Sequence, residues 1–176
     1  HGMLILSPRA VERLENYSPP WPLPKIFRLT KGGKLIEGIF RGATINTPSM
    51  LCVADYLDAL SWIRSLGGLH GAITKSEANL KVLREFVSQR EWIHFLAVED
   101  DQISNTSVCL TLDVDADRVK EIVRLLDNEG AAFDIGAYRD APAGLRIWCG
   151  ATVEEYDLKI LMPWIDWAYK SVKELS

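Results

Sequence analysis

At 176 residues, the chain is long enough for one ordinary domain or two small packed units with a hydrophobic core. Its composition, 48% hydrophobic and 25% charged, is typical of a folded globular protein. The net charge of −4 argues against nucleic-acid binding, since proteins of that class usually have a basic face. No apolar run approaches the length of a membrane span and the first residues do not resemble a secretion signal, so we expect a cytoplasmic protein.

The cysteines and histidines predict neither disulfides nor a metal site. Cys52, Cys109 and Cys149 are odd in number and far apart, and apolar residues surround each of them. We therefore expect three buried, free thiols in a reducing compartment. The three histidines lack the spacing of metal ligands, so we expect no bound metal.

The first forty residues predict a strand, a helix and a hairpin. Residues 3–6 form a continuous apolar run, which favours a strand buried on both faces. Ser7 and Pro8 are typical of a helix start, and the repeated prolines of residues 17–25 favour an extended connector. Residues 25–41 predict a hairpin about a Gly-Gly pair. Because the chain enters an apolar strand at once, we expect it to be part of a longer protein.

Two helices are expected next. Thr47 as the N-cap and Pro48 at the first helical position predict a helix over residues 48–66, which a pair of glycines ends. A second helix is expected over about residues 69–89, with an apolar face that includes Ile73.

From residue 92 onward the pattern alternates between strands and helices. Asp115 is the expected cap of one helix, and Thr152 and Glu155 form a capping box before the last helix. The expected elements are strands at 93–98, 106–114, 131–137 and 144–149, and helices at 116–129 and 152–175.

The order β-β-α-β-β-α predicts an α/β fold, an open sandwich of roughly 85 residues. We expect residues 1–68 to be the end of a larger domain, residues 69–91 to be a bridging helix and residues 92–176 to be a small C-terminal domain.

Asn46 and Thr47 precede a predicted helix N-terminus, and this position has two interpretations. The free amides and the positive end of the helix dipole can bind an anion. Thr47 can equally be a simple N-cap. The residues alone favour neither interpretation.

Two arginines flank the turn within the string GAYRDAPAGLRIW. Arg146 lies in an apolar strand-like run, where an arginine can be a solubility charge on an edge strand. Its apolar neighbours favour the other interpretation, an anion partner, and a carboxylate matches the guanidinium best. Arg139 lies at the start of the same turn and could hold a second anion. The pair predicts a pocket for a small ligand with two or three negative charges.

Several unusual strings occur in an order that resembles the phosphoserine aminotransferase family, class V enzymes of fold type I that use pyridoxal 5′-phosphate. The resemblance covers essentially the whole chain and is carried by the strings HGMLILSPRAVERLE, PPWPLPKIFRLTKGGKLIEGIFRG, INTPSMLCV, AYRDAPAGLRIW, GATVE and MPWIDWAY. It implies that residues 1–68 end the cofactor-binding domain of an enzyme that works as a homodimer, and that this chain is its C-terminal half.

The resemblance also assigns roles to the candidate residues. It implies that Arg146 binds the α-carboxylate of the substrate, and that Tyr138 and Arg139 bind its phosphate. Many relatives have a histidine where this chain has Tyr138. It further implies that Asn46 and Thr47 reach the cofactor phosphate in the partner subunit.

The Schiff-base lysine of the family is expected before His1. No lysine of this chain, including Lys25, Lys31 and Lys34, corresponds to it, and no catalytic residue is therefore assigned.

The activity that the resemblance implies is amino transfer between O-phosphoserine and 2-oxoglutarate, which gives 3-phosphohydroxypyruvate and glutamate in serine biosynthesis. This chain alone is expected to be inactive. Two alternatives are another class V aminotransferase, acting on serine or alanine with glyoxylate, and a stand-alone ligand-binding or regulatory α/β module.

Overall fold

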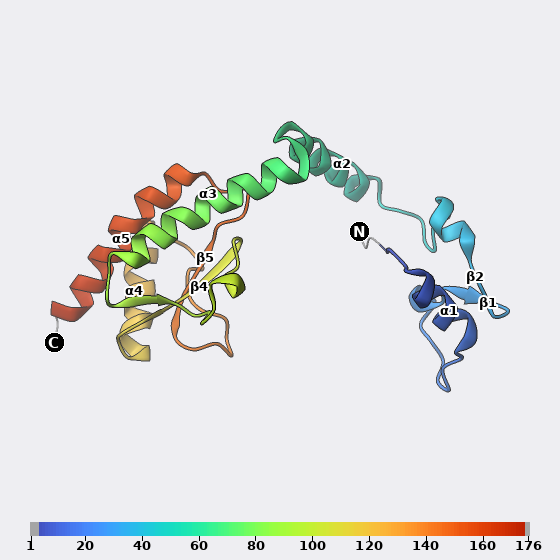
Figure 1. The fold of residues 1–176 in the computed structure, drawn as a ribbon, viewed down its shortest axis with the longest axis horizontal. Helices are drawn as coiled ribbons and strands as arrows, with labels where there is room; N and C mark the ends of the chain where they lie inside the picture. The colour runs from blue at the N-terminus through green and yellow to red at the C-terminus, as the bar shows by residue number, and fades with distance from the viewer. Residues whose placement is uncertain (1–3, 175–176) are drawn as a thin grey trace. The chain divides into compact units, whose positions relative to one another are not determined.

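The structure is a computed structural model, and it describes residues 4–174 of the chain. The chain divides into two compact units, His1–Trp62 and Ile63–Ser176. Figure 1 shows both, the first in blue to cyan and the second from green to red. Short 3₁₀ helices occur in both units, at Lys25–Phe27, Glu37–Arg41 and Asp100–Gln102.

The first unit contains a short helix and a small hairpin. Helix α1 (Pro8–Asn16) begins where the Ser7 hydroxyl accepts from the amide of Ala10 at 3.2 Å, so the expected cap is confirmed. The strands β1 (Thr30–Lys31) and β2 (Lys34–Leu35) pair antiparallel, as the sequence predicts.

The turn of this hairpin depends on glycine. Gly32 and Gly33 have φ angles of 59° and 73°, the left-handed values that a tight two-residue hairpin turn requires. The hairpin is fastened to α1, because the Glu15 carboxylate accepts from the Leu35 amide at 3.0 Å and from Lys34 Nζ at 3.1 Å.

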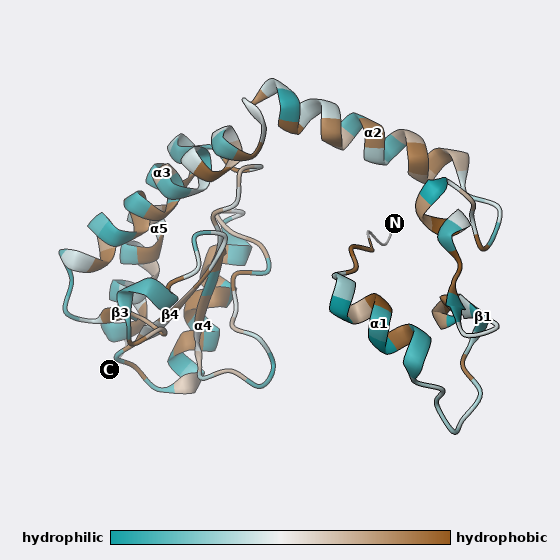
Figure 2. Ribbon diagram, turned by 45° about the vertical axis from the view of Figure 1, so that its right-hand side comes forward, coloured by the Kyte–Doolittle hydropathy of each residue, from teal (hydrophilic) through white to brown (hydrophobic). Residues whose placement is uncertain are grey.

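The first unit buries very little of its apolar surface. Helix α2 (Met50–Ser65) has no buried residue, and neither does α1. Hydrophobic residues recur along α2 in Figure 2, and the exposed ones include Leu51 and Leu57, at 71% and 57% exposure. A helix that is hydrophobic on every side normally lies inside a protein core. The apolar pattern of α2 therefore indicates packing against further polypeptide.

The second unit is an α/β domain built on a three-stranded antiparallel sheet. Its strands are β3 (Ile93–Phe95), β4 (Ser107–Leu112) and β5 (Gly144–Trp148), in the order β3-β4-β5. In the register of β4 and β5, Cys109 lies opposite Arg146.

Three helices contribute to one core with this sheet: α3 (Gly68–Ser88), α4 (Ala116–Asn128) and α5 (Glu155–Glu174). Helices α3 and α5 lie side by side in Figures 1 and 2 and contact each other, and α4 packs on α5 and β5. The fully buried side chains include Leu83, Ile93, Ile122, Leu126, Leu145 and Ile165. The α/β class that the sequence predicts is confirmed.

Two expected strands are not formed. Residues 4–6 carry no secondary structure and Ile5 is 92% exposed, whereas Met3 lies outside the described residues. Of residues 131–137, only Gly136 makes a β-bridge, to Leu145. The segment turns instead at Asp134, whose φ of 51° interrupts an extended strand.

The caps of two helices differ from those expected. Helix α2 begins at Met50, since the carbonyl and the hydroxyl of Ser49, rather than Thr47, accept from the first-turn amides. Helix α5 begins at Glu155, because the Thr152 hydroxyl accepts from the indole Nε1 of Trp148 at 2.8 Å. Ser49 thus takes the place of Thr47 as the cap of α2, and the expected cap of α5, Thr152, binds the Trp148 indole instead.

Candidate functional site

Arg146 lies in the middle of β5, on the sheet face opposite the helices. Strand alternation sends Leu145 and Ile147 into the core, at 1% and 4% exposure. The Arg146 side chain therefore projects from the other face, where it remains 25% exposed. The sheet thus accommodates an arginine between two core residues, with its charged end at the surface.

The Arg146 guanidinium has two neighbours from the segment before the turn. Its Nη2 donates to Asp134 Oδ2 at 2.7 Å and to the Asp134 carbonyl at 3.3 Å. Its Cζ lies 4.5 Å from the centroid of the Tyr138 ring, a cation–π arrangement. The Asp134 carboxylate, and after it the Tyr138 phenol, raises the pKa of Arg146, which stays charged at any physiological pH.

Tyr138 connects this guanidinium to β4. Its hydroxyl lies 3.3 Å from the Ser107 hydroxyl, and its side chain is half exposed. The Ser107 hydroxyl, followed by the Arg146 guanidinium, lowers the pKa of Tyr138 by favouring the phenolate. A fixed positive charge beside two hydroxyl groups is an arrangement suited to binding an oxyanion.

Arg139 is exposed, and within residues 4–174 it makes no hydrogen bond or ion pair. It lines an open hollow of about 490 Å³ together with Tyr138 and Lys120. Arg146 lines a different hollow, of about 310 Å³, at the edge of β5. The single pocket expected between the two arginines is therefore two hollows, one lined by Arg139 and one by Arg146. Tyr138 links them, because it lines the Arg139 hollow and its ring contacts the Arg146 guanidinium.

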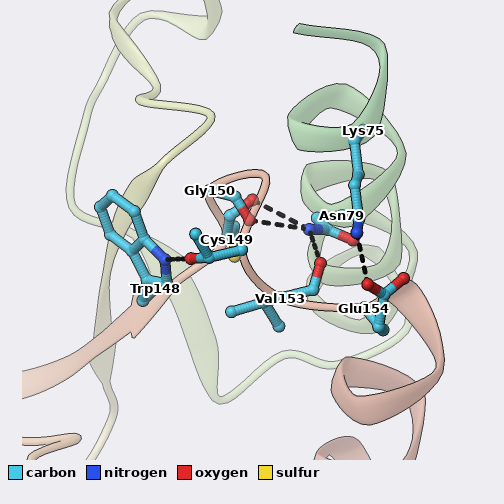
Figure 3. A network of polar contacts seen from close by, with 8 residues as sticks. Lys75, Asn79, Trp148, Cys149, Gly150, Val153 and Glu154 are labelled. Atoms are coloured by element: carbon cyan, nitrogen blue, oxygen red, sulfur yellow. Dashed lines mark hydrogen bonds and ion pairs between the residues drawn. The ribbon is translucent and has the colours of Figure 1, made fainter. Parts of the chain in front are cut away.

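A buried asparagine holds the turn that follows β5 (Figure 3). Asn79 on α3 is fully buried, and its Nδ2 donates to the carbonyls of Cys149, Gly150 and Val153 at 3.0, 3.3 and 2.9 Å. Its Oδ1 has no partner in the described part of the chain. An ion pair between Lys75 and Glu154 lies beside this network. Together these contacts fix the end of the strand that carries Arg146.

Asn46 and Thr47 lie in the irregular segment before α2, and both are exposed. Neither makes a hydrogen bond within the described residues, so the amide and the hydroxyl remain available to an external group. Since Ser49 caps the helix, the interpretation of Thr47 as its N-cap is wrong. A phosphate fits this pair chemically, because both side chains can donate to its oxygens.

Two further residues of the site, Asp134 and Ser107, could not be selected from the sequence alone. Asp134 lies within a segment that was expected to be a strand, and Ser107 lies within another expected strand, so neither position indicated a functional role. Only the fold brings them to Arg146 and Tyr138, through the register of β4 and β5 and the positive φ of Asp134.

The three thiols differ in their exposure. Cys149 is buried and Cys109 half-buried, but Cys52 is exposed, so the expected burial of all three thiols is wrong for Cys52. Residues 4–174 contain no group of three His, Cys, Asp or Glu side chains that could hold a metal ion. No helix in that range has the length and apolarity needed to cross a membrane.

Comparison with known proteins gives consistent results. No family model matches the chain. The sequence is 59% identical over 173 residues to the phosphoserine aminotransferase of Methanosarcina mazei, covering 98% of this chain and 47% of that protein. The phosphoserine aminotransferase of Methanosarcina barkeri gives the same identity and coverage. The chain therefore spans about half the length of the curated relatives it matches.

Solved structures share the fold. The phosphoserine aminotransferase of Bacillus circulans subsp. alkalophilus superposes with a TM-score of 0.71 at 20% identity, over 85% of this chain and 39% of that one. A phosphoserine aminotransferase studied for radiation damage of its Schiff base superposes with a TM-score of 0.72 at 15% identity, over 92% of this chain and 42% of that one. The resemblance found in the sequence is confirmed: nearly the whole of this chain corresponds to about half of a phosphoserine aminotransferase.

Proposed function

We propose that the protein containing this chain transfers an amino group between O-phosphoserine and 2-oxoglutarate, giving 3-phosphohydroxypyruvate and glutamate in serine biosynthesis. The observation that carries this proposal is the 59% identity to two phosphoserine aminotransferases over 98% of the chain. Identity at this level, sustained over both units, favours conservation of the reaction as well as of the fold.

In this proposal Arg146 binds the α-carboxylate of the substrate. Its guanidinium is fixed on a rigid strand, partly exposed and stacked on Tyr138. A planar guanidinium matches a carboxylate with two parallel hydrogen bonds, so it fixes both the position and the orientation of the amino acid.

Arg139 and Tyr138 bind the phosphate of the substrate. Support comes from the availability of Arg139, which has no ion-pair partner among the described residues, and from its place beside Tyr138 on the neighbouring hollow. Two hollows, each with one arginine, fit a ligand whose carboxylate and phosphate are separated by a short carbon chain.

Asn46 and Thr47 would hold the phosphate of pyridoxal 5′-phosphate in the partner subunit of a homodimer. Their exposed, unpaired donors fit that group. When bound, this cofactor supplies an electron sink and carries the amino group. The Schiff-base lysine is expected before His1, so Lys25, Lys31 and Lys34 receive no catalytic role. Lys34 is already paired with Glu15.

The two units have different roles in this account. Residues 1–68 belong to the cofactor-binding domain, residues 69–91 form the helix that leads out of it, and residues 92–176 form the small domain. The absence of buried residues in α2 supports this division, since a helix that is apolar on all sides needs surrounding polypeptide. The second unit, in contrast, has its own core.

A class V aminotransferase acting on serine or alanine with glyoxylate would not need Arg139. The test is an Arg139→Ala variant of the intact protein, assayed with phosphoserine and with serine. We expect kcat/KM for phosphoserine to fall about 10- to 100-fold, the effect of losing one charge-assisted contact, while turnover of serine changes little. An Asp140→Asn variant is the control for a change of charge at the same turn. Equal losses on both substrates would contradict the phosphate role.

A further inference from the structure

The carboxylate of Asp134 already occupies part of the anion-binding edge of Arg146. Its Oδ2 accepts from Nη2 at 2.7 Å, whereas the Asp134 side chain is otherwise 89% exposed. Asp134 is also the only non-glycine with a positive φ in the described part of the chain. The chain thus adopts an uncommon backbone conformation at the residue that presents a carboxylate to this guanidinium.

The contact between the two side chains is incomplete. Asp134 engages Nη2, but Nε, which lies on the same side of the guanidinium, is buried and has no partner in residues 4–174. A carboxylate that bridges Nε and Nη2 would satisfy both donors. A ligand carboxylate that displaces Asp134 and reaches Nε would make a hydrogen bond that Asp134 does not make.

We propose that Asp134 is a tethered competitor for the carboxylate position on Arg146, and that it thereby lowers the affinity of the site for carboxylate ligands. The proposal rests on the assignment of Arg146 as the substrate carboxylate clamp. A ligand must displace an aspartate that is permanently close by, which weakens the binding of every carboxylate. A ligand with a second anion recovers the loss at Arg139, whereas a simple amino acid does not.

The direct test is the affinity of the intact protein for phosphoserine and for serine, measured by isothermal titration calorimetry. Asp134→Asn removes the competing charge and keeps the side-chain size, and asparagine tolerates the positive φ. We expect this variant to bind both ligands about two- to five-fold more tightly, since a partly exposed ion pair no longer has to be broken. Asp140→Asn, which removes a nearby exposed carboxylate, should leave both affinities within a factor of about 1.5 of the wild-type values.

An Arg146→Met variant separates the competitor role from the clamp role. If Arg146→Met weakens binding and Asp134→Asn strengthens it, both roles are supported. If Arg146→Met weakens binding but Asp134→Asn weakens it or leaves it unchanged, Asp134 only orients the guanidinium, and the competitor proposal is overturned while the clamp remains. If Arg146→Met has no effect, the clamp and the competitor are overturned together. Circular dichroism of each variant establishes that it is folded.

Discussion

Asn79 and Val153 are 74 positions apart, yet the Asn79 amide donates to the Val153 carbonyl at 2.9 Å inside the second unit. The same Nδ2 reaches the carbonyls of Cys149 and Gly150. One side chain on α3 thus satisfies three backbone acceptors in the turn between β5 and α5. The turn has a backbone hydrogen bond of its own, from the Val153 amide to the Gly150 carbonyl at 3.1 Å, and Asn79 adds a donor for all three carbonyls.

Replacing Asn79 with alanine should destabilise the protein by about 2–4 kcal/mol, because buried carbonyls lose their donor. Urea unfolding, monitored by circular dichroism, measures this change in the free energy of unfolding. Asn105, whose amide donates to Glu77 at an exposed site, provides the matched control, and its alanine variant should lose less than about 0.5 kcal/mol. Similar losses for the two variants would show that the three carbonyls find other donors.

The pair of Arg90 and Asp166 predicts a second large effect. Nε and Nη2 of Arg90 contact the two carboxylate oxygens at 2.7 and 2.5 Å, and both side chains are only about a fifth exposed. Asp166→Ala leaves the guanidinium partly buried without its counter-ion, so we expect a loss of about 1–3 kcal/mol.

The exposed pair of Arg124 and Glu121 on α4 is the control for this experiment. Glu121→Ala removes a surface ion pair of similar geometry and should change the unfolding free energy by only about 0.2–1 kcal/mol. If Asp166→Ala lowers the free energy of unfolding no more than Glu121→Ala does, partial burial does not make the Arg90–Asp166 pair more stabilising than an exposed pair.

Cys149 predicts how stability changes at alkaline pH. Burial raises the pKa of its thiol to about 12, whereas an exposed thiol in the unfolded chain ionises near 8.5. Above pH 9 the folded state therefore binds more protons than the unfolded state, and stability falls as pH rises towards 12. The free energy of unfolding should fall more steeply between pH 9 and 11 for the wild type than for Cys149→Ala, by up to about 1.4 kcal/mol per pH unit.

The three thiols should also differ in reactivity. Cys52 is exposed and should react with a thiol reagent in the native protein, while Cys149 should react only after unfolding. Equal rates for the two cysteines would show that the core around Cys149 opens readily.

The two units should differ in their ability to fold alone. A polypeptide of residues 67–176 retains the whole core of the second unit and should unfold cooperatively with urea. A polypeptide of residues 1–66 buries none of its described side chains in α1 or α2, and it should bind a hydrophobic dye and show no cooperative transition. Cooperative unfolding of the polypeptide of residues 1–66 would contradict the proposed need for a larger domain around it.

Local signals in the sequence predicted much of the second unit. Asp115 was expected to cap α4, and its carboxylate does accept from the amides of Asp117 and Arg118 at 3.1 and 2.9 Å. The strand expected at residues 106–114 is likewise present as β4 (Ser107–Leu112). These features depend on neighbours within a few positions, so a single sequence records them.

Features that depend on distant partners were not predictable in the same way. The apolar run at residues 4–6 was expected to form a buried strand, but these residues pair with no strand of the described chain and Ile5 is exposed. In the sequence Asn79 is indistinguishable from other polar helix residues, and only the fold brings the turn after β5 within hydrogen-bond distance of its amide. Asp134 appeared to be part of a strand because a positive φ at an aspartate leaves no pattern in the letters. An anion partner for Arg146 was predictable, but not that the Asp134 carboxylate would contact its guanidinium.

The most direct test of the whole account is the substrate preference of the intact protein with its cofactor. The measurement is kcat/KM for phosphoserine with 2-oxoglutarate, compared with that for serine and for alanine with glyoxylate. If Arg139 and Arg146 act as a pair of anion clamps, phosphoserine should be preferred by at least about 100-fold. Turnover of serine or alanine with glyoxylate at an equal or higher kcat/KM would contradict the account.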